Sequence, residues 1–302
     1  MTGLARAELE IGRTTRSYWW APGQGAALPL IVVFHGLGAD GKVMAALTGL
    51  GQRGPAAGFA VAFPDGVGRV WDAAGRLPGR EAVDDSGFVR SLVDKLVDDG
   101  TARPGPLFLV GMSNGALFVE HLARHGLVVP TGLVLVSGTA RVTSRREVPR
   151  PPLPCTVLSV QGTADPMMPY EGGRTGGRGA AGWLNARRAR RRGEPVEDRF
   201  LAPAEAVAAD WAAANGITAP PSFESFPTSE RALHVARLSW LAPGRRPVVL
   251  YRIEGGGHTW PGGPQYLPAR LVGRVSHDLD ATGAVLEMAR QETGRLGSSG
   301  TG

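Results

Sequence analysis

The 302-residue chain carries 33 Lys and Arg residues against 27 Asp and Glu residues, which gives a formal net charge of +6 and a pI near 10.2. Its 43% hydrophobic and 20% charged residues are typical of a folded globular protein and exclude an intrinsically disordered chain. No apolar run is long enough to span a bilayer, and a single cysteine, Cys155, excludes an internal disulfide. The chain therefore does not require an oxidising compartment.

The basic charge alone would allow nucleic-acid binding. However, 31 of the 33 basic residues are Arg, and they are scattered along the chain except for one cluster at Arg187–Arg192. Because Arg, Ala, Gly and Pro are abundant together, this bias indicates genome composition. We expect no nucleic-acid partner and no membrane partner. A basic nucleic-acid-binding module that keeps the same fold is the non-enzyme alternative.

Short apolar runs recur along the first half of the chain. Residues 9–21 alternate loosely and predict one or two antiparallel edge strands. Continuous apolar runs predict strands buried on both faces at 30–34, 59–63, 107–110 and 133–136, and the 156–160 segment predicts the next strand. Helical patterns lie between most of them, at 43–50 (ended by Gly54-Pro55), 88–97 (capped by Asp84 or Asp85) and 114–124. This alternation predicts a mainly parallel, doubly wound α/β sheet with helices on both faces.

The regular alternation lapses after residue 160. Residues 172–182 are rich in Gly and Arg and predict a mobile loop, and the Arg187–Arg192 cluster follows. A helix at 203–215, strands at 235–241 and 248–253, and a closing helix at 281–290 complete the predicted elements. We therefore expect one domain over residues 1–296, with an irregular Arg/Gly-rich insertion at about 172–202 and a disordered tail at 297–302.

The sequence Gly111-Met112-Ser113-Asn114-Gly115 directly follows the 107–110 run and precedes a helical pattern. A strand, G-x-S-x-G and a helix in this order form the context of a nucleophile elbow. The glycines allow a sharp turn that presents an exposed Ser113 hydroxyl at its apex, and the helix N-terminus favours developing negative charge. The pattern predicts Ser113 as a nucleophile. A Gly-Ser-Gly turn that merely connects two elements is the alternative.

A serine nucleophile needs a base, and the base needs a third group that orients it. In an open parallel sheet such groups gather at the carboxyl ends of the strands. Asp165 lies five residues beyond Val160, and His258 lies five residues beyond Ile253. The order Ser, Asp, His along the chain is that of the α/β-hydrolases. We therefore predict Asp165 as the orienting acid and His258 as the base.

The other histidines and acids fit these roles less well. His121 and His125 lie on the elbow helix itself, and His35 sits beside glycines that favour a backbone role. His234 and His277 have no loop signature. Turn or helix-cap roles are expected for the remaining acids near predicted turns, Asp65, Asp72, Asp84 and Asp85.

A tetrahedral intermediate needs two hydrogen-bond donors aimed at its oxygen. The backbone N–H of Asn114, which follows the nucleophile, is expected to supply one of them. The backbone N–H of Leu37, in the loop after the 30–34 strand, is expected to supply the other. Three apolar side chains near the predicted site are candidates for substrate contact: Trp260, Trp71 and Met112. Core packing is the alternative for the two tryptophans.

Longer segments surround these residues: VVFHGLG (32–38), FPDG…W (63–71), VDDSGFVRSLVDKL (83–96), GMSNGALF (111–118), QGTADPMMPYEGG (161–173), WAAANG (211–216) and GGGHTWPGG (255–263). In these segments the chain resembles the polyhydroxybutyrate depolymerase family of α/β-hydrolases, which also includes feruloyl and acetyl-xylan esterases. The resemblance implies an α/β-hydrolase fold and places nucleophile, acid and base at Ser113, Asp165 and His258. It also implies that no metal or organic cofactor takes part.

The resemblance implies a serine esterase acting on hydroxyalkanoate oligomers or polyester, or on short-chain or aromatic acyl esters. A feruloyl or acetyl-xylan esterase and a peptidase on the same scaffold are the alternatives. Many secreted members carry cysteines where this chain has Leu37 and Ile217, and its N-terminus lacks the apolar core of a signal peptide. These features favour a cytoplasmic protein, with an extracellular one as the family-based alternative. The oligomeric state is not predicted.

The Arg187–Arg192 cluster has two interpretations. It is either a solvated surface loop or a mobile flap that attracts carboxylate-bearing substrates such as hydroxyalkanoate oligomers. The flap hypothesis predicts that neutralising the arginines raises KM for anionic esters more than for neutral ones.

Overall fold

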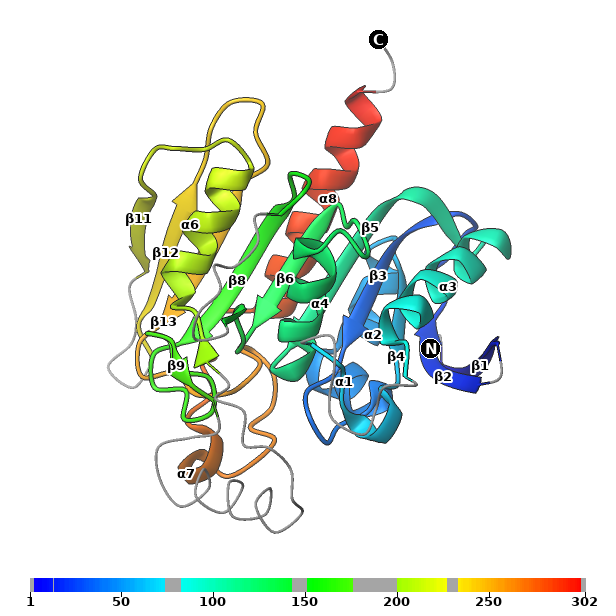
Figure 1. The fold of residues 1–302 in the computed structure, drawn as a ribbon, viewed down its shortest axis with the longest axis horizontal. Helices are drawn as coiled ribbons and strands as arrows, with labels where there is room; N and C mark the ends of the chain where they lie inside the picture. The colour runs from blue at the N-terminus through cyan, green and yellow to red at the C-terminus, as the bar shows by residue number, and fades with distance from the viewer. Residues whose placement is uncertain are drawn as a thin grey trace.

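A ten-stranded sheet in the order β1-β2-β4-β3-β5-β6-β8-β13-β12-β11 organises the fold (Figure 1). The computed structural model describes residues 3–12, 14–73, 83–142, 151–175, 200–226 and 233–299, and the Arg187–Arg192 cluster lies outside these ranges. The strands of the large sheet are β1 (Ala5–Ile11), β2 (Thr14–Ala21), β3 (Leu28–Phe34), β4 (Ala60–Pro64), β5 (Ala102–Met112), β6 (Gly132–Val136), β8 (Thr156–Gly162), β11 (Ser222–Phe226), β12 (Val235–Trp240) and β13 (Val248–Ile253). A small sheet contains β7 (Arg141–Val142), β9 (Gly173–Arg174) and β10 (Phe200–Leu201).

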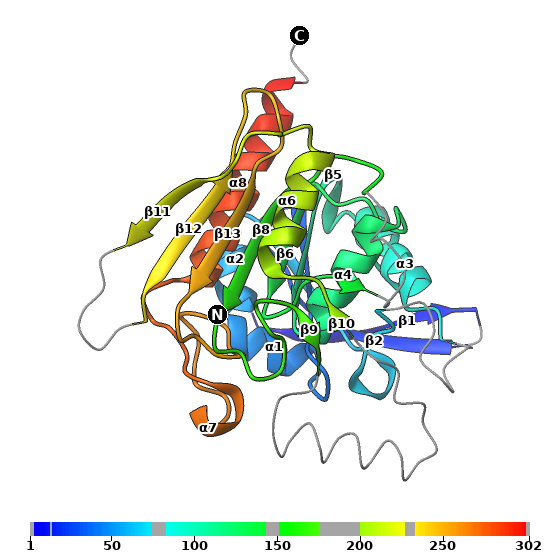
Figure 2. The same ribbon diagram turned by 60° about the vertical axis from the view of Figure 1, so that its left-hand side comes forward.

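The six central strands of the large sheet, from β4 to β13, run parallel, whereas both edges are antiparallel hairpins. Two layers of helices cover the sheet (Figures 1 and 2). The helices are α1 (Gly41–Thr48), α2 (Leu50–Ala56), α3 (Asp85–Asp98), α4 (Asn114–Arg124), α6 (Ala204–Ala214), α7 (Ala269–Val272) and α8 (Ala281–Ser299), with a short 3-10 turn, η1, at Val67–Arg69. The predicted mainly parallel sheet with helices on both faces is confirmed.

Alternation along the central strands divides the apolar residues between two cores. In β3, Val32 and Phe34 face a core that also holds Phe88 of α3 and Phe118 of α4. Ile31 and Val33 of the same strand face the second core, which α1, α2 and α8 cover. A strand that is apolar at every position therefore lies between two buried layers, as its continuous run predicts.

The ends of several elements differ from those that the sequence predicts. The first helix is broken at Gly49, which takes a positive φ of 65°, so α2 continues through Gly54-Pro55 to Ala56. β5 begins at Ala102, before the Pro104-Gly105-Pro106 segment, because β3 pairs with it on both sides of a register shift. β11 is a strand that the sequence analysis missed, because four of its five residues are exposed and it carries no apolar run.

Helix α8 also runs further than predicted, through Ser299, so the predicted disordered tail does not begin at Gly297. Contacts with the β12–β13 loop explain this extension. Arg295 donates a hydrogen bond to the carbonyl oxygen of Arg245, and Glu292 forms an ion pair with Arg246. These bonds hold the last turns of the helix against the loop. None of the helices in the described part of the chain is long and apolar enough to cross a membrane.

Asn215, at the end of α6, ties this helix to the start of two central strands. Its side-chain oxygen accepts a hydrogen bond from the Cys155 N–H, and its side-chain nitrogen donates to the carbonyl oxygens of Cys155 and Arg246. The residue is buried, with 2% of its surface exposed. Removing the amide would leave these backbone groups buried without a partner, which is costly.

We expect Asn215→Ala to lower the free energy of unfolding by about 2–4 kcal/mol, because it strands two or three buried backbone groups. Urea unfolding followed by circular dichroism measures the change. The control is Gln291→Ala on the exposed face of α8, which we expect to change stability by less than about 0.5 kcal/mol. Equal stability of the two variants would contradict the assigned role of Asn215.

Candidate active site

Ser113 lies in a sharp turn between β5 and α4, with φ 57° and ψ −120°. Two glycines permit this turn because they lie against crossing backbone. A Cβ on Gly111 would lie 2.4 Å from the carbonyl carbon of Gly115, and a Cβ on Gly115 would lie 2.3 Å from the Phe34 oxygen. A strained, non-glycine residue at such a turn is a feature of functional sites. The geometry of the predicted elbow is therefore present.

The Ser113 residue is 7% exposed, so the side chain does not stand out into solvent as the sequence analysis expects. The neighbouring strand ends surround it. A Cβ on Gly36 would lie 3.2 Å from the Ser113 Cβ, and a Cβ on Gly138 would lie 2.9 Å from the Ser113 carbonyl oxygen. The Ser113 N–H donates to Val136 at the end of β6. The serine therefore lies between the ends of β3 and β6, at the carboxyl edge of the sheet.

Asp165 and His258 meet at the carboxyl ends of β8 and β13. Nδ1 of His258 lies 2.7 Å from Oδ2 of Asp165, and both side chains are almost fully buried. The other carboxylate oxygen of Asp165 accepts hydrogen bonds of 2.8 Å from the backbone N–H groups of Met167 and Met168. Both oxygens of the carboxylate are therefore occupied, which fixes its orientation and that of the imidazole.

The loop that carries His258 is held toward the elbow. Ser137, directly after β6, donates from its hydroxyl to the carbonyl oxygen of Thr259. Tyr266 donates to the carbonyl oxygen of His258, and burial, with a smaller effect of Asp165, raises the pKa of Tyr266 to about 12. In the described structure no hydrogen bond joins the Ser113 hydroxyl to the His258 ring. Such contacts are often long in an unliganded site and tighten when substrate binds.

His35 has a side-chain role that the sequence analysis missed. Its Nε2 accepts a hydrogen bond of 2.9 Å from the Gly66 N–H, so the ring proton lies on Nδ1, which is 2.8 Å from the Gly36 carbonyl oxygen. Burial lowers the pKa of His35. Because the peptide bond is planar and trans, fixing the Gly36 carbonyl also fixes the Leu37 N–H, which points the opposite way. The signal in the sequence that points to this role is the position of His35 directly after a buried strand.

Asn114 is held by its side chain against Trp71. The side-chain oxygen accepts a 2.7 Å hydrogen bond from the Trp71 N–H, and the side-chain nitrogen donates to the Trp71 carbonyl oxygen. Within the described residues, the backbone N–H groups of Leu37 and Asn114 have no hydrogen-bond acceptor. Two N–H donors without partners thus lie on either side of the serine. Leu37 is in the loop after β3 and Asn114 is at the start of α4, and these two elements approach each other at Gly115.

The three candidate substrate contacts are core residues, which corrects the sequence analysis. Trp71 is fully buried and stacks on Phe118, with ring centroids 5.1 Å apart. Trp260 is fully buried as well, and its indole N–H donates to Thr282 of α8. Met112 is 4% exposed and belongs to the core under α8. The burial of these three side chains depends on how the long loops pack over the sheet. The spacing of residues along the sequence does not reveal this packing.

The remaining acids fall into two groups. Asp65 accepts a hydrogen bond from the first N–H of α1 and Asp84 accepts one from the Gly87 N–H, so both have the expected cap roles. Asp85 instead forms a buried ion pair with Arg16. Within the described residues, no cluster of three or more His, Cys, Asp or Glu side chains could hold a metal ion.

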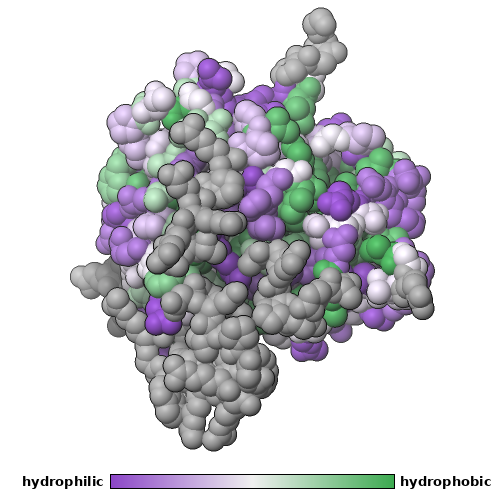
Figure 3. All heavy atoms as spheres, in the orientation of Figure 1, coloured by the Kyte–Doolittle hydropathy of each residue, from purple (hydrophilic) through white to green (hydrophobic). Residues whose placement is uncertain are grey.

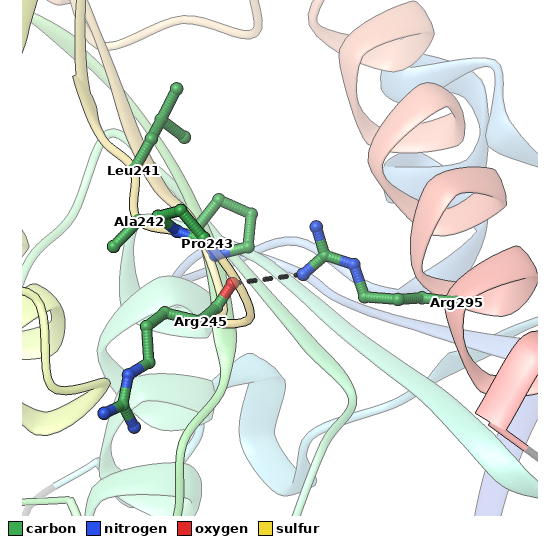
Figure 4. Close-up of a pocket in the computed structure, with 6 residues that line it drawn as sticks. Leu241, Ala242, Pro243, Arg245 and Arg295 are labelled. Atoms are coloured by element: carbon green, nitrogen blue, oxygen red, sulfur yellow. Dashed lines mark hydrogen bonds between the residues drawn. The ribbon is translucent and has the colours of Figure 1, made fainter.

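A separate cavity of about 250 Å³ lies between the β12–β13 loop and α8 (Figure 4). Leu241, Arg245 and Arg295 are among its lining residues, and Arg295 donates to the Arg245 carbonyl oxygen there. This cavity is at the amino end of β13, whereas His258 follows its carboxyl end. The cavity therefore lies at the opposite end of the sheet from Ser113.

Comparison with known proteins places this geometry in context. No protein-family model matches the chain. A protein of Nocardia uniformis subsp. tsuyamanensis named “Putative esterase NocK” is 30% identical over 299 residues, which cover 95% of this chain and 82% of the relative.

A solved structure is similar in fold over most of the chain. An acetyl xylan esterase from Aspergillus awamori superposes with a TM-score of 0.59 at 13% identity, over 92% of this chain and 99% of that one. A thermostable esterase matches with a TM-score of 0.44 at 15% identity, over 56% of this chain and 48% of that one. The fold is the predicted α/β-hydrolase fold, and the chain belongs to the same family as the protein named “Putative esterase NocK”.

Proposed function

We propose that the protein is a serine hydrolase of carboxylic esters, with Ser113 as nucleophile, His258 as general base and Asp165 as the group that orients the imidazole. The observation that carries the proposal is the buried His258–Asp165 pair at the same end of the sheet as the strained Ser113 turn. The 30% identity of the chain to a protein named “Putative esterase NocK” supports ester hydrolysis as the reaction class.

In this mechanism Nδ1–H of His258 donates to Asp165, which leaves Nε2 as the acceptor for the Ser113 proton. The alkoxide oxygen attacks the ester carbonyl, and the tetrahedral oxyanion accepts hydrogen bonds from the N–H groups of Leu37 and Asn114. The imidazolium then gives the proton to the leaving alcohol. A water molecule, deprotonated in turn by His258, releases the acyl group and restores the serine.

Exposed apolar side chains support an ester with an apolar acyl or alcohol part. They follow four different strands at the carboxyl end of the sheet, where Ser113 lies: Leu37, Val67, Met167, Tyr266, Leu267 and Leu271. On the coloured part of the face drawn in Figure 3, hydrophilic and hydrophobic residues are interspersed. Exposed apolar surface at the same end of the sheet as a site favours ligands that bury it.

Within this class we propose polyhydroxybutyrate depolymerase-like substrates, namely hydroxyalkanoate oligomers or polyester, or short-chain or aromatic acyl esters. The sequence segments around Ser113, Asp165 and His258 support this choice. Feruloyl esters, acetylated xylan and peptide-like amides are the competing substrates, and they differ in acyl length, aromaticity and leaving group.

We expect the wild-type protein to hydrolyse p-nitrophenyl butyrate and Ser113→Ala to reduce kcat at least about 10⁴-fold, because no other hydroxyl replaces the nucleophile. The control is Ser276→Ala, which removes a buried hydroxyl from the loop beyond His258. Stopped assays with equal amounts of folded protein measure the rates. Turnover by the Ser113 variant at the wild-type rate would contradict the mechanism.

A substrate panel tests the proposed ester class. We expect kcat/KM for a hydroxybutyrate dimer and for butyrate esters to exceed that for acetylated xylo-oligosaccharides and for p-nitroanilides by at least about tenfold, since each methylene buried on apolar surface contributes about 0.8 kcal/mol. Liquid chromatography of the released acids measures all substrates on one scale. Preference for acetylated sugars or anilides would favour the esterase or peptidase alternative.

The His35 ring predicts a pH effect on stability. Its folded-state pKa is lowered below the unfolded value of about 6.5, so the unfolded chain binds more protons and stability is lost as pH falls below about 6.5. We expect His35→Gln to be less stable than wild type at pH 7.5 but to show a shallower decline toward pH 5, by at most about 1.4 kcal/mol per pH unit. Urea unfolding at four pH values measures the difference.

His121 titrates over the same range, because burial lowers its pKa to about 4. The comparison between wild type and the His35 variant removes this shared contribution. If the free energy of unfolding of the two proteins changed with pH in parallel, the folded state would not require a neutral His35.

A further inference from the structure

The 65–72 loop (residues 65–72, after β4) is closed at both ends by one buried ion pair. Arg16 of β2 donates to the carbonyl oxygen of Asp65 at 3.3 Å and to Oδ1 of Asp85 at 2.8 Å. The other oxygen of Asp85 accepts a 3.0 Å hydrogen bond from the Asp72 N–H. One carboxylate and one guanidinium thus join the first and the last residue of the loop. We call this pair the clasp.

Between its two ends, the 65–72 loop bonds to both segments that carry the proposed oxyanion donors. Toward the Leu37 segment, Gly66 donates to His35 Nε2, Trp71 donates from its indole to the His35 carbonyl oxygen, and the Arg69 carbonyl oxygen accepts from the Gly38 N–H. Toward the other donor, the Trp71 backbone makes both hydrogen bonds to the Asn114 side chain. The loop therefore spans the two donors.

The clasp is built for rigidity. Its side chains are 6% and 1% exposed, and the Arg16 guanidinium also lies over the Phe88 ring, 4.1 Å from its centroid. A buried pair of this kind adds little net stability compared with apolar residues, because both charges must be desolvated. Its main effect is therefore on the geometry of the loop, whose two ends it joins.

We propose that Arg16 and Asp85 are positioning residues for the oxyanion hole, which they act on through the 65–72 loop. The proposal rests on the proposed function above. Donor N–H groups contribute most when they are fixed before charge develops, and a displacement of about 1 Å can cost up to about 100-fold in rate. Loosening the loop therefore weakens binding of the transition state and leaves ground-state binding of the ester nearly unchanged.

The test removes both charges at once, in the double variant Arg16→Met with Asp85→Leu, so that no buried charge is left alone. We expect kcat for p-nitrophenyl butyrate to fall about tenfold to 100-fold with KM changed less than about twofold. The inhibition constant of an aryl trifluoromethyl ketone, which forms a tetrahedral adduct, should rise by the same factor as kcat falls. Rates are referred to active sites titrated with a fluorophosphonate, so misfolded protein does not enter kcat.

The matched control is the ion pair between Arg246 and Glu292, which joins the β12–β13 loop to α8 at the other end of the sheet. Its double variant, Arg246→Met with Glu292→Leu, should lower the unfolding midpoint to a similar extent and leave kcat per titrated site within about twofold of wild type. If the clasp double variant yields no titratable sites, Asp85→Asn replaces it, with an expected fall in kcat of at least about threefold.

Two results would overturn the proposal in different ways. A wild-type protein that neither hydrolyses esters nor reacts with the fluorophosphonate removes the proposed function, and the clasp proposal with it. An active wild type whose clasp variant matches the control variant in kcat and in ketone affinity leaves the esterase function standing and reduces the clasp to a stabilising contact.

Discussion

The close crossing of β3 and the start of α4 is the contact on which the site depends. No side chain fits at Gly115, since a Cβ there would lie 2.3 Å from the Phe34 oxygen. The same approach brings the end of β3, with Gly36 and Leu37, beside the strained Ser113 turn. One backbone contact thus brings together a proposed nucleophile and both proposed donors for the oxyanion, before any side chain is considered.

Hydrogen bonds between loops, more than apolar packing, fix the groups around this contact. The loop after β4 reaches both donor segments, and the loop after β6 reaches the histidine loop through Ser137. Parallel strands deliver these loops to one edge of the sheet, but they do not set their mutual orientation. Buried polar networks of this kind specify a single arrangement when each member has a partner.

The central sheet could be predicted because most of its strands contain a continuous apolar run, as in β3, β4 and β6, which reports burial on both faces. Asp165 and His258 could be found because they follow strand ends, and the structure joins them at 2.7 Å. The burial of Trp71 could not be predicted, and neither could the different roles of Asp84, which caps a helix, and Asp85, which forms a buried ion pair. Both depend on which distant segment packs against the residue, Asn114 in one case and Arg16 in the other.

The Asp165 carboxylate shows how far the geometry constrains the chemistry. Two backbone N–H groups occupy Oδ1, so rotation of the carboxylate would cost two hydrogen bonds, and Oδ2 remains directed at His258. The imidazole must then carry its proton on Nδ1, and Nε2 is left as an acceptor, which has no hydrogen-bond partner among the described residues. At the same end of the sheet as the strained Ser113 turn, this tautomer leaves Nε2 free to accept a proton, which is what the proposed mechanism requires of His258.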